Sequence, residues 1–145
     1  ALMLEITEEL LMSDRHRATE ILRRLRVQGV EISVDDFGTG YSSLAYLREL
    51  PVDELKLDRS FVAPMADDAR AASLVVSAIS LAHSLGLRIV AEGVEDARTL
   101  AELARHGCDE AQGYFLSRPV PAAELDLDHS SSRINHSLPV RNPDE

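Results

Sequence analysis

The fold is decided by residues 29–44, which read Gly-Val-Glu-Ile-Ser-Val-Asp-Asp-Phe-Gly-Thr-Gly-Tyr-Ser-Ser-Leu. The first glycine follows an amphipathic run over residues 14–28, and a glycine in this place typically ends a helix in the left-handed conformation. Residues 30–34 form an apolar, strand-like run that ends in two adjacent carboxylates, Asp35 and Asp36. This stretch therefore predicts a helix, a glycine cap and a strand with a polar end.

The same succession recurs further along the chain, with glycines at positions 86 and 107. Two more strand-like runs, residues 2–7 and 54–58, lack the preceding glycine. Helices that alternate with strands predict a parallel sheet joined by right-handed crossovers. The five predicted strands end in polar side chains: Glu5, Asp35, Lys56, Glu92 and Gln112.

Two layouts satisfy this pattern, an open doubly wound sheet and a closed barrel. Lys56 and Asp58 lie on one face of their strand, and Leu55 and Leu57 lie on the other. Leucines packed on outer helices, with ionic groups facing an interior, favour the barrel. A complete barrel has about 250 residues. We therefore expect an α/β fold with five or so β/α units of a TIM-like (β/α)8 barrel, incomplete in this chain.

Periodicity is lost after Leu127, so residues 128–145 are predicted to be a flexible C-terminal tail. The chain starts at Ala1 and enters a strand-like run at once, which suggests a piece of a longer protein.

The composition of the 145 residues, with 45% hydrophobic and 28% charged side chains, is normal for a globular domain. A net charge of −10 argues against a broad basic surface for DNA or anionic lipid. An acidic site can still bind a phosphate compound when Mg²⁺ or Mn²⁺ lies between them. One cysteine and no run of about 20 apolar residues predict a cytoplasmic segment without membrane contact, although the parent protein can be anchored elsewhere.

Asp35 and Asp36 are the leading candidates for metal ligands. Neighbouring carboxylates repel each other, so a cation between them favours their ionised forms. Glu5, Lys56 and Glu92 are expected at the same barrel mouth, because parallel strands end there together. A purely structural role, without metal or catalysis, stays open for these residues: the two aspartates can be a helix cap or a solvated pair, and Glu5 can form an interior ion pair with Lys56.

Lys56 permits two chemistries. It can form a Schiff base with a carbonyl substrate, as in barrel aldolases, or position a metal-bound water during phosphodiester hydrolysis. Surrounding carboxylates keep the pKa of a lysine high, which favours the second chemistry. Glu92 is a candidate base or ligand of a second metal ion, whereas Glu95 can simply favour the dipole of the helix that follows.

Five segments together resemble the EAL family of cyclic di-GMP phosphodiesterases. They appear in the family's order and span nearly everything from Leu2 to about Leu125: residues 4–8, 35–44, 50–58, 91–95 and 107–114. The resemblance implies a TIM-like barrel that hydrolyses cyclic di-GMP to linear 5′-pGpG with two Mg²⁺ or Mn²⁺ ions. The family's Glu-Ala/Val-Leu segment and an Asn ligand are absent here. Residues 1–127 are therefore expected to be the C-terminal part of an EAL domain, inactive or nearly so alone.

The resemblance also assigns roles to individual residues. Glu5, Asp35 and Asp36 would be metal ligands, Lys56 would contact the attacking water, and Glu92 would bind the second metal or act as base. Supporting or substrate-contacting roles would fall to Thr7, Glu8, Asp58, Glu95 and Gln112.

Partners also follow from the resemblance. Thr7 and Glu8 would fix the loop after Asp36, through Ser43, where the family couples catalysis to dimerisation, so a homodimer through this loop is expected. The parent protein can also carry a linked sensory or GGDEF domain.

Two readings of a different class stay open. One is a receptor that binds cyclic di-GMP without cutting it and signals through a partner. The other is an interaction module in which incomplete barrels associate through unpaired strand edges near Glu5 and Gln112.

Overall fold

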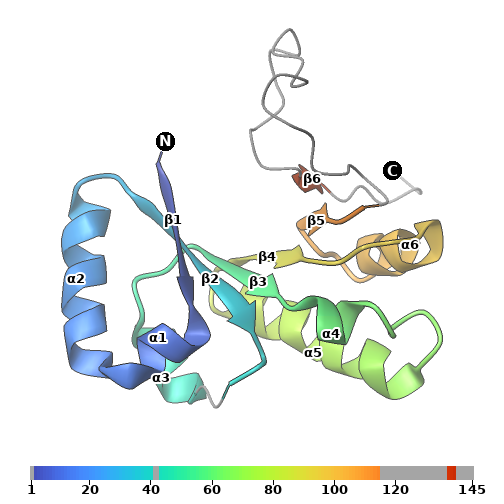
Figure 1. The fold of residues 1–145 in the computed structure, drawn as a ribbon, viewed down its shortest axis with the longest axis horizontal. Coiled ribbons are helices and arrows are strands. Elements are labelled where there is room, and N and C mark those ends of the chain that lie inside the picture. Colours follow the sequence, from blue (N-terminus) through green and yellow to red (C-terminus); the bar gives the residue numbers. More distant parts are fainter. Residues whose placement is uncertain (1, 41–42, 115–136, 140–145) are drawn as a thin grey trace, which may run out of the picture.

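The structure, a computed structural model, describes residues 2–40, 43–114 and 137–139. Five parallel strands lie side by side in chain order and are joined by helices, and a sixth strand pairs antiparallel with the fifth (Figure 1). The strands are β1 (Met3–Thr7), β2 (Glu31–Phe37), β3 (Glu54–Leu57), β4 (Arg88–Ala91), β5 (Glu110–Gln112) and β6 (Ser137–Pro139). The predicted parallel sheet with alternating helices is confirmed.

The helices are α1 (Glu8–Ser13), α2 (Arg15–Val27), α3 (Leu44–Glu49), α4 (Arg59–Val62), α5 (Ala69–Ser84) and α6 (Ala97–Arg105). Four of them begin at an aspartate whose side chain accepts a hydrogen bond from a backbone N–H of the first turn, as N-cap residues do. These caps are Asp14, Asp58, Asp68 and Asp96. Ser43 stands at the N-cap of α3, and its side chain makes no capping hydrogen bond.

The core lies between the sheet and the helices that cover its outer face. Strand side chains on this face are almost completely buried, and they pack against apolar side chains of α2, α5 and α6. Burial of each large apolar side chain contributes about 1.5–3 kcal/mol. The set includes Val34, Leu55, Leu57, Ile89, Leu22, Val75, Ile79 and Leu103.

The opposite, inner face of the sheet carries ionic and polar groups, as predicted for a barrel interior. Glu54 is only 3% exposed and accepts a hydrogen bond from Ser33 Oγ at 2.9 Å. Arg88 Nη2 lies 2.9 Å from Glu31 Oε2 and 3.4 Å from Glu54 Oε2. Burial raises the pKa of Glu54, although Ser33 and Arg88 oppose this shift. Charged groups thus line the amino end of this face.

The two edges of the sheet differ. Beside β1, Leu2 and Leu4 are 70% and 39% exposed, and an apolar hollow lies between β1, α1 and α2. At the other edge, Gln112 pairs with Ser137 of β6, so the unpaired edge expected near Gln112 is occupied by backbone hydrogen bonds. Of the predicted tail, only residues 137–139 are described, and they form this strand; the remainder lies outside the described residues.

The longest helix of the described segments, α5, has 16 residues, and none of these helices combines the length and apolar character required to cross a bilayer.

Candidate metal centre

Three carboxylates meet at the carboxyl ends of β2 and β4. Asp35, Asp36 and Glu92 each offer one oxygen, and these oxygens all lie within 4.8 Å of one another. All three side chains are partly buried. A set of anionic oxygen donors fits a hard divalent cation such as Mg²⁺ or Mn²⁺ rather than a soft one. The predicted ligands Asp35, Asp36 and Glu92 are therefore brought together.

A break in strand pairing explains how two consecutive aspartates reach one place. Successive side chains of a regular strand point to opposite faces, but the register between β2 and β3 shifts between Val34 and Phe37. Asp36 has a φ of 55°, a left-handed conformation that Asp tolerates better than most residues. The Asp36 N–H donates to Asp35 Oδ1 at 2.9 Å. The irregularity turns Asp36 back towards its neighbour.

Burial and neighbouring negative charges raise the pKa of two carboxyl groups of the cluster. Burial and the charge of Asp35 raise the pKa of Glu92 to about 7, against the opposing effect of Lys56. Burial, Asp35 and Asp58 likewise raise the pKa of Asp36. Burial is the larger cause of both shifts, the charge of Asp35 adds to it, and a bound cation would oppose both.

Lys56 lies beside this cluster, with its side chain only 6% exposed. Its Nζ is 2.5 Å from Glu5 Oε1 and 3.5 Å from Glu92 Oε1. Burial lowers the pKa of Lys56, but Glu5, Glu92 and Asp35 together outweigh it, so the pKa is raised overall. Lys56 is therefore an ammonium ion, which suits it to hold an anion or a water and not to attack a carbonyl carbon.

Glu5 takes a different place from the one expected for a metal ligand. Its carboxylate forms an ion pair with Lys56, and its side chain is 42% exposed. Glu5 does not belong to the three-carboxylate cluster. This pairing is the interior ion pair that the sequence left open. Its assignment as a metal ligand stays a prediction.

Glu8 anchors the loop after β2. It is 2% exposed, and its Oε2 accepts hydrogen bonds from the N–H groups of Gly38 and Gly40, at 3.1 Å and 3.0 Å. Thr7 is the N-cap of α1, where its Oγ1 accepts from the Leu10 N–H at 3.3 Å. Thr7 thus caps α1 directly after β1, and Glu8 holds the loop after β2. Positions 41 and 42 of that loop lie outside the described residues.

The remaining predicted supporting residues surround the same mouth. Asp58 caps α4 by accepting from the Ser60 N–H at 2.8 Å, and this contact with Ser60 lowers the pKa of Asp58. Its carboxyl group also interacts with that of Asp36. The backbone oxygen of Gln112 accepts from the Val94 N–H at 2.9 Å, which ties β5 to the loop after β4.

Arg59 was not among the site residues predicted from the sequence, and it pairs with Glu95 at 3.2 Å. Glu95 precedes the Asp96 cap of α6, so it lies outside the first helical turn, and its partner is Arg59. Gly93 has a φ of 75°, and a Cβ there would clash with the Cβ of Arg59. The sequence contained an indication of Arg59 as a site residue, because this basic residue stands directly after Asp58 at a predicted strand end.

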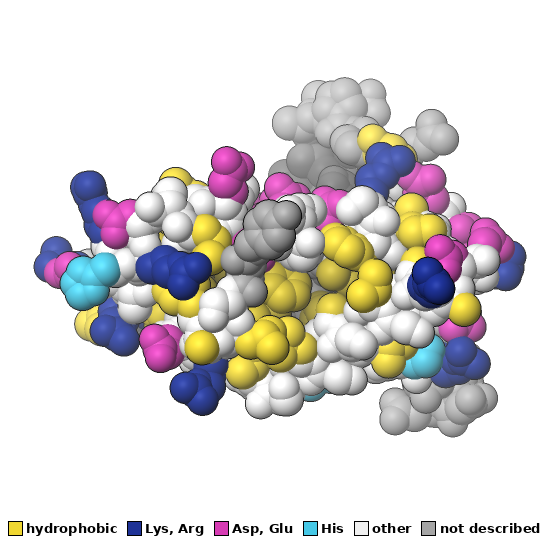
Figure 2. All heavy atoms as spheres, turned by 90° about the horizontal axis from the view of Figure 1, so that it is seen from below, with side chains coloured by type: hydrophobic (Ala, Val, Ile, Leu, Met, Phe, Trp, Pro, Cys, Tyr) yellow, Lys and Arg dark blue, Asp and Glu magenta, His cyan; other side chains and the backbone are white. Residues whose placement is uncertain are grey.

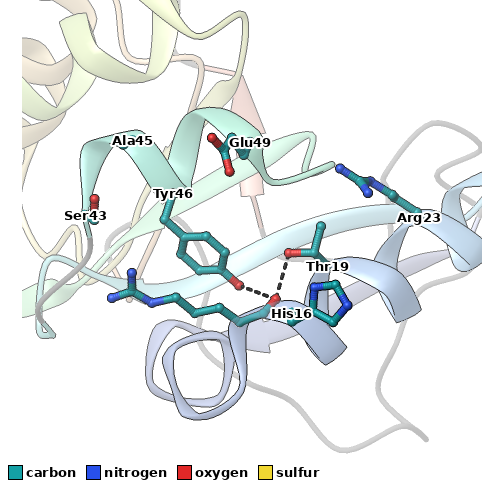
Figure 3. A pocket seen from close by; sticks show the side chains of 8 residues that line it. His16, Thr19, Arg23, Ser43, Ala45, Tyr46 and Glu49 are labelled. Carbon is teal, nitrogen blue, oxygen red and sulfur yellow. Dashed lines mark hydrogen bonds between the residues drawn. The ribbon is translucent and has the colours of Figure 1, made fainter.

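A second hollow, of about 460 Å³, lies away from this mouth between α2 and α3 (Figure 3). The Tyr46 hydroxyl is directed at the backbone oxygens of Leu11 and Arg15, at 3.1 Å and 3.2 Å, and the Arg15 guanidinium lies 5.1 Å from the Tyr46 ring centroid. Thr19 Oγ1 donates to the same Arg15 oxygen at 2.8 Å. These contacts join α3 to α2 and account for the burial of Tyr46.

On one face of the molecule, hydrophobic side chains gather near the middle, and acidic and basic side chains lie mainly around the rim (Figure 2). The basic side chains on this face are scattered among acidic ones.

The fold and the cluster define a β/α-barrel type of domain with an acidic site at the strand ends. Comparison with known proteins gives the family: the EAL domain model matches residues 1–119. The chain belongs to the EAL domain family and corresponds to its C-terminal part, and its sheet is part of a TIM-like barrel.

Relatives are similar over most of this chain. The cyclic di-GMP phosphodiesterase NbdA of Pseudomonas aeruginosa is 46% identical over 140 residues, which are 97% of this chain and 18% of that protein. The solved PaMucR phosphodiesterase in complex with c-di-GMP is 48% identical, with a TM-score of 0.80 over 84% of this chain and 49% of that one. The EAL domain of Mycobacterium smegmatis DcpA is 47% identical, with a TM-score of 0.78 over 84% of this chain and 55% of that one. The chain thus spans about half of these solved chains and under a fifth of NbdA.

Proposed function

We propose that this chain supplies part of a metal-dependent phosphodiesterase site that hydrolyses cyclic di-GMP to linear 5′-pGpG. The observation that carries the proposal is the meeting of Asp35, Asp36 and Glu92, with oxygens within 4.8 Å, beside the buried ammonium of Lys56. The names of the relatives, among them cyclic di-GMP phosphodiesterases NbdA and RocR of Pseudomonas aeruginosa, support the choice of substrate.

The donor set determines where a cation would bind. Asp35, Asp36 and Glu92 would hold Mg²⁺ or Mn²⁺, and Glu5 would join them for a second ion if it left Lys56. Such ions neutralise the phosphate and lower the pKa of the attacking water.

The residues of the chain divide the remaining work between them. Lys56 Nζ donates a hydrogen bond to the attacking water or to a phosphate oxygen and so orients it. Glu92 would either bind the second metal ion or, with its carboxylate free of metal, accept the proton of that water. The water oxygen forms a bond to phosphorus, the bond from phosphorus to the 3′ oxygen breaks, and the 3′ oxygen takes a proton from solvent.

A receptor function is the alternative. The EAL domain of FimX from Pseudomonas aeruginosa, solved bound to c-di-GMP, is 26% identical, with a TM-score of 0.79. The pairing of Glu5 with Lys56 favours this alternative, because it removes one expected ligand from the cluster. The homodimer through the loop after Asp36 and a linked sensory or GGDEF domain stay predictions.

The test measures three quantities on the 145-residue chain and on its Asp35→Asn variant: binding of Mn²⁺, binding of cyclic di-GMP, and release of pGpG by ion-exchange chromatography. Asp53→Asn, a substitution at an aspartate outside the cluster, is the control. The same quantities are measured after the N-terminal part of the EAL domain is supplied. Hydrolysis that Asp35→Asn abolishes supports the phosphodiesterase. Binding of both ligands without turnover in the completed domain supports the receptor. Failure of the completed domain to bind either ligand contradicts both functions.

A further inference from the structure

The mouth of the sheet combines many carboxylates with few cations. Lys56, in β3, and Arg59, at the start of α4, are two cations of the described segment that leads away from the mouth, and they differ in exposure. Lys56 is 6% exposed and held between two carboxylates, whereas Arg59 is 65% exposed and contacts one, that of Glu95. Arg59 is therefore the cation that remains available to a ligand.

The backbone fixes where Arg59 stands. It is the first residue of α4 and directly follows Asp58, whose carboxyl group interacts with that of Asp36. On its other side, Arg59 packs so closely against Gly93 that a side chain there would clash with it. Gly93 is the neighbour of Glu92 in sequence. Arg59 thus lies between the β3 end and the loop that carries a member of the metal cluster.

Its present partner holds it weakly. The two side chains are 65% and 48% exposed, and a solvent-exposed ion pair of this kind contributes about 0–1 kcal/mol. An arginine can bind a phosphate through two parallel hydrogen bonds, which are stronger and more directional than a single contact to a solvated carboxylate. A phosphate at the mouth can therefore displace Glu95 at little cost.

A cyclic dinucleotide carries two phosphodiester groups. The cluster with its cation and Lys56 serve the one that is cut, so the other enters a strongly acidic mouth and needs a positive partner. We infer that Arg59 binds the uncut phosphate of cyclic di-GMP and exchanges Glu95 for it when the dinucleotide binds. This inference rests on the proposed function and makes Arg59 a substrate-binding residue.

The test compares four variants by their dissociation constant for cyclic di-GMP in the presence of Ca²⁺, and by KM and kcat where turnover occurs. Arg59→Gln removes the cation and is expected to weaken binding about tenfold, in line with a lost hydrogen bond between charged groups, with kcat little changed. Arg59→Lys is expected to restore part of the loss, because it keeps the charge but not the fork.

The other two variants separate binding from structure. Arg98→Gln removes an equally exposed arginine that bonds Asp67 and the backbone oxygen of Ala66, and it should leave the dissociation constant unchanged. Glu95→Gln removes the carboxylate that a bound phosphate would displace from Arg59, and it should bind cyclic di-GMP up to threefold more tightly than the wild type.

The outcomes distinguish the inference from the function on which it rests. If Arg59→Gln binds like Arg98→Gln, or if Glu95→Gln loses affinity as Arg59→Gln does, the inference is wrong while the proposed function stands. If the wild-type chain does not bind cyclic di-GMP even when the N-terminal part of the EAL domain is supplied, the proposed function is wrong and the inference goes with it.

Discussion

Lys56 Nζ and Glu92 Oε1 lie 3.5 Å apart across neighbouring strands, and the pKa of Glu92 is nevertheless about 7. An ammonium this close normally lowers the pKa of a carboxyl group. Burial and the charge of Asp35 outweigh it here. Glu92 is thus poised to exchange a proton near neutral pH while its neighbour stays charged, and two predictions depend on this state.

The first prediction concerns metal affinity. A proton and a cation compete for Glu92, so Mn²⁺ should bind more weakly as the pH falls below about 7, the pKa of Glu92 in the metal-free protein. We expect the affinity to fall about tenfold per pH unit below that pKa for this single competing proton. Mn²⁺ titrations between pH 5.5 and 8, followed by electron paramagnetic resonance, measure this dependence. In Glu92→Gln the affinity should be lower throughout and its dependence on pH shallower; an unchanged slope would contradict the assignment.

The second prediction concerns stability without metal. The pKa of Glu92 is raised in the folded protein above 4.5, the value of an unperturbed glutamate, so the folded state binds the proton more tightly than the unfolded state does. The stability this contributes is present below about pH 4.5 and is lost as the pH rises through about 7. In EDTA at pH 8, Glu92→Gln should therefore have a higher free energy of unfolding than the wild type.

Urea unfolding at pH 5 and pH 8 measures this difference. The advantage of Glu92→Gln should shrink at pH 5, where the wild-type carboxyl group is largely protonated. Equal advantages at both pH values would mean that the variant stabilises the fold by some route other than the removed charge.

The elements themselves could be predicted from sequence because their signals are local. The glycine at 29 follows helix α2 with a φ of 82°, and Gly86 follows α5 with a φ of 72°. Strand alternation correctly placed Leu55 towards the helices and Lys56 on the opposite face. Cys108, which directly follows the helix-ending Gly107, is buried, and burial raises the pKa of its thiol to about 12.

What could not be predicted depends on contacts between distant residues. The register shift after Val34 arises from pairing with β3, and it decides where Asp36 points. Whether Glu5 joins a metal or Lys56 depends on a side-chain contact between residues 51 positions apart. The strand at residues 137–139 forms by pairing with the edge of β5, and its own residues carry no pattern that predicts a strand.

The third prediction concerns the anchor of the loop after β2. Glu8 is buried and accepts hydrogen bonds from two backbone N–H groups of that loop. Glu8→Gln keeps the shape but halves the accepting capacity and removes the charge, so we expect a loss of about 1–3 kcal/mol in the free energy of unfolding. Amide exchange at Gly38 and Gly40 should accelerate more than exchange elsewhere. The neighbouring, exposed Glu9 is the control, and Glu9→Gln should change neither quantity; equal effects of both variants would contradict a specific anchor.

The fourth prediction tests what Lys56 does for the site. Lys56→Met retains much of the apolar stem but leaves Glu5 and Glu92 without their cation, and breaking a buried pair from one side costs about 3–5 kcal/mol. The cost should be lower here because Glu5 is 42% exposed and water can solvate it. Removal of Lys56 should also raise the pKa of Glu92 further, since Lys56 now lowers it. Carbon-13 NMR of the Glu92 carboxyl group measures that pKa directly.

Lys56→Arg keeps the charge and should hold the pKa of Glu92 near its present value, but a planar guanidinium cannot place one donor where Nζ stands. If hydrolysis of cyclic di-GMP is lost in both variants while the pKa of Glu92 changes only in Lys56→Met, then Lys56 acts through the position of its donor. If the Lys56→Arg variant hydrolyses cyclic di-GMP normally, the positive charge at position 56 alone is sufficient for hydrolysis.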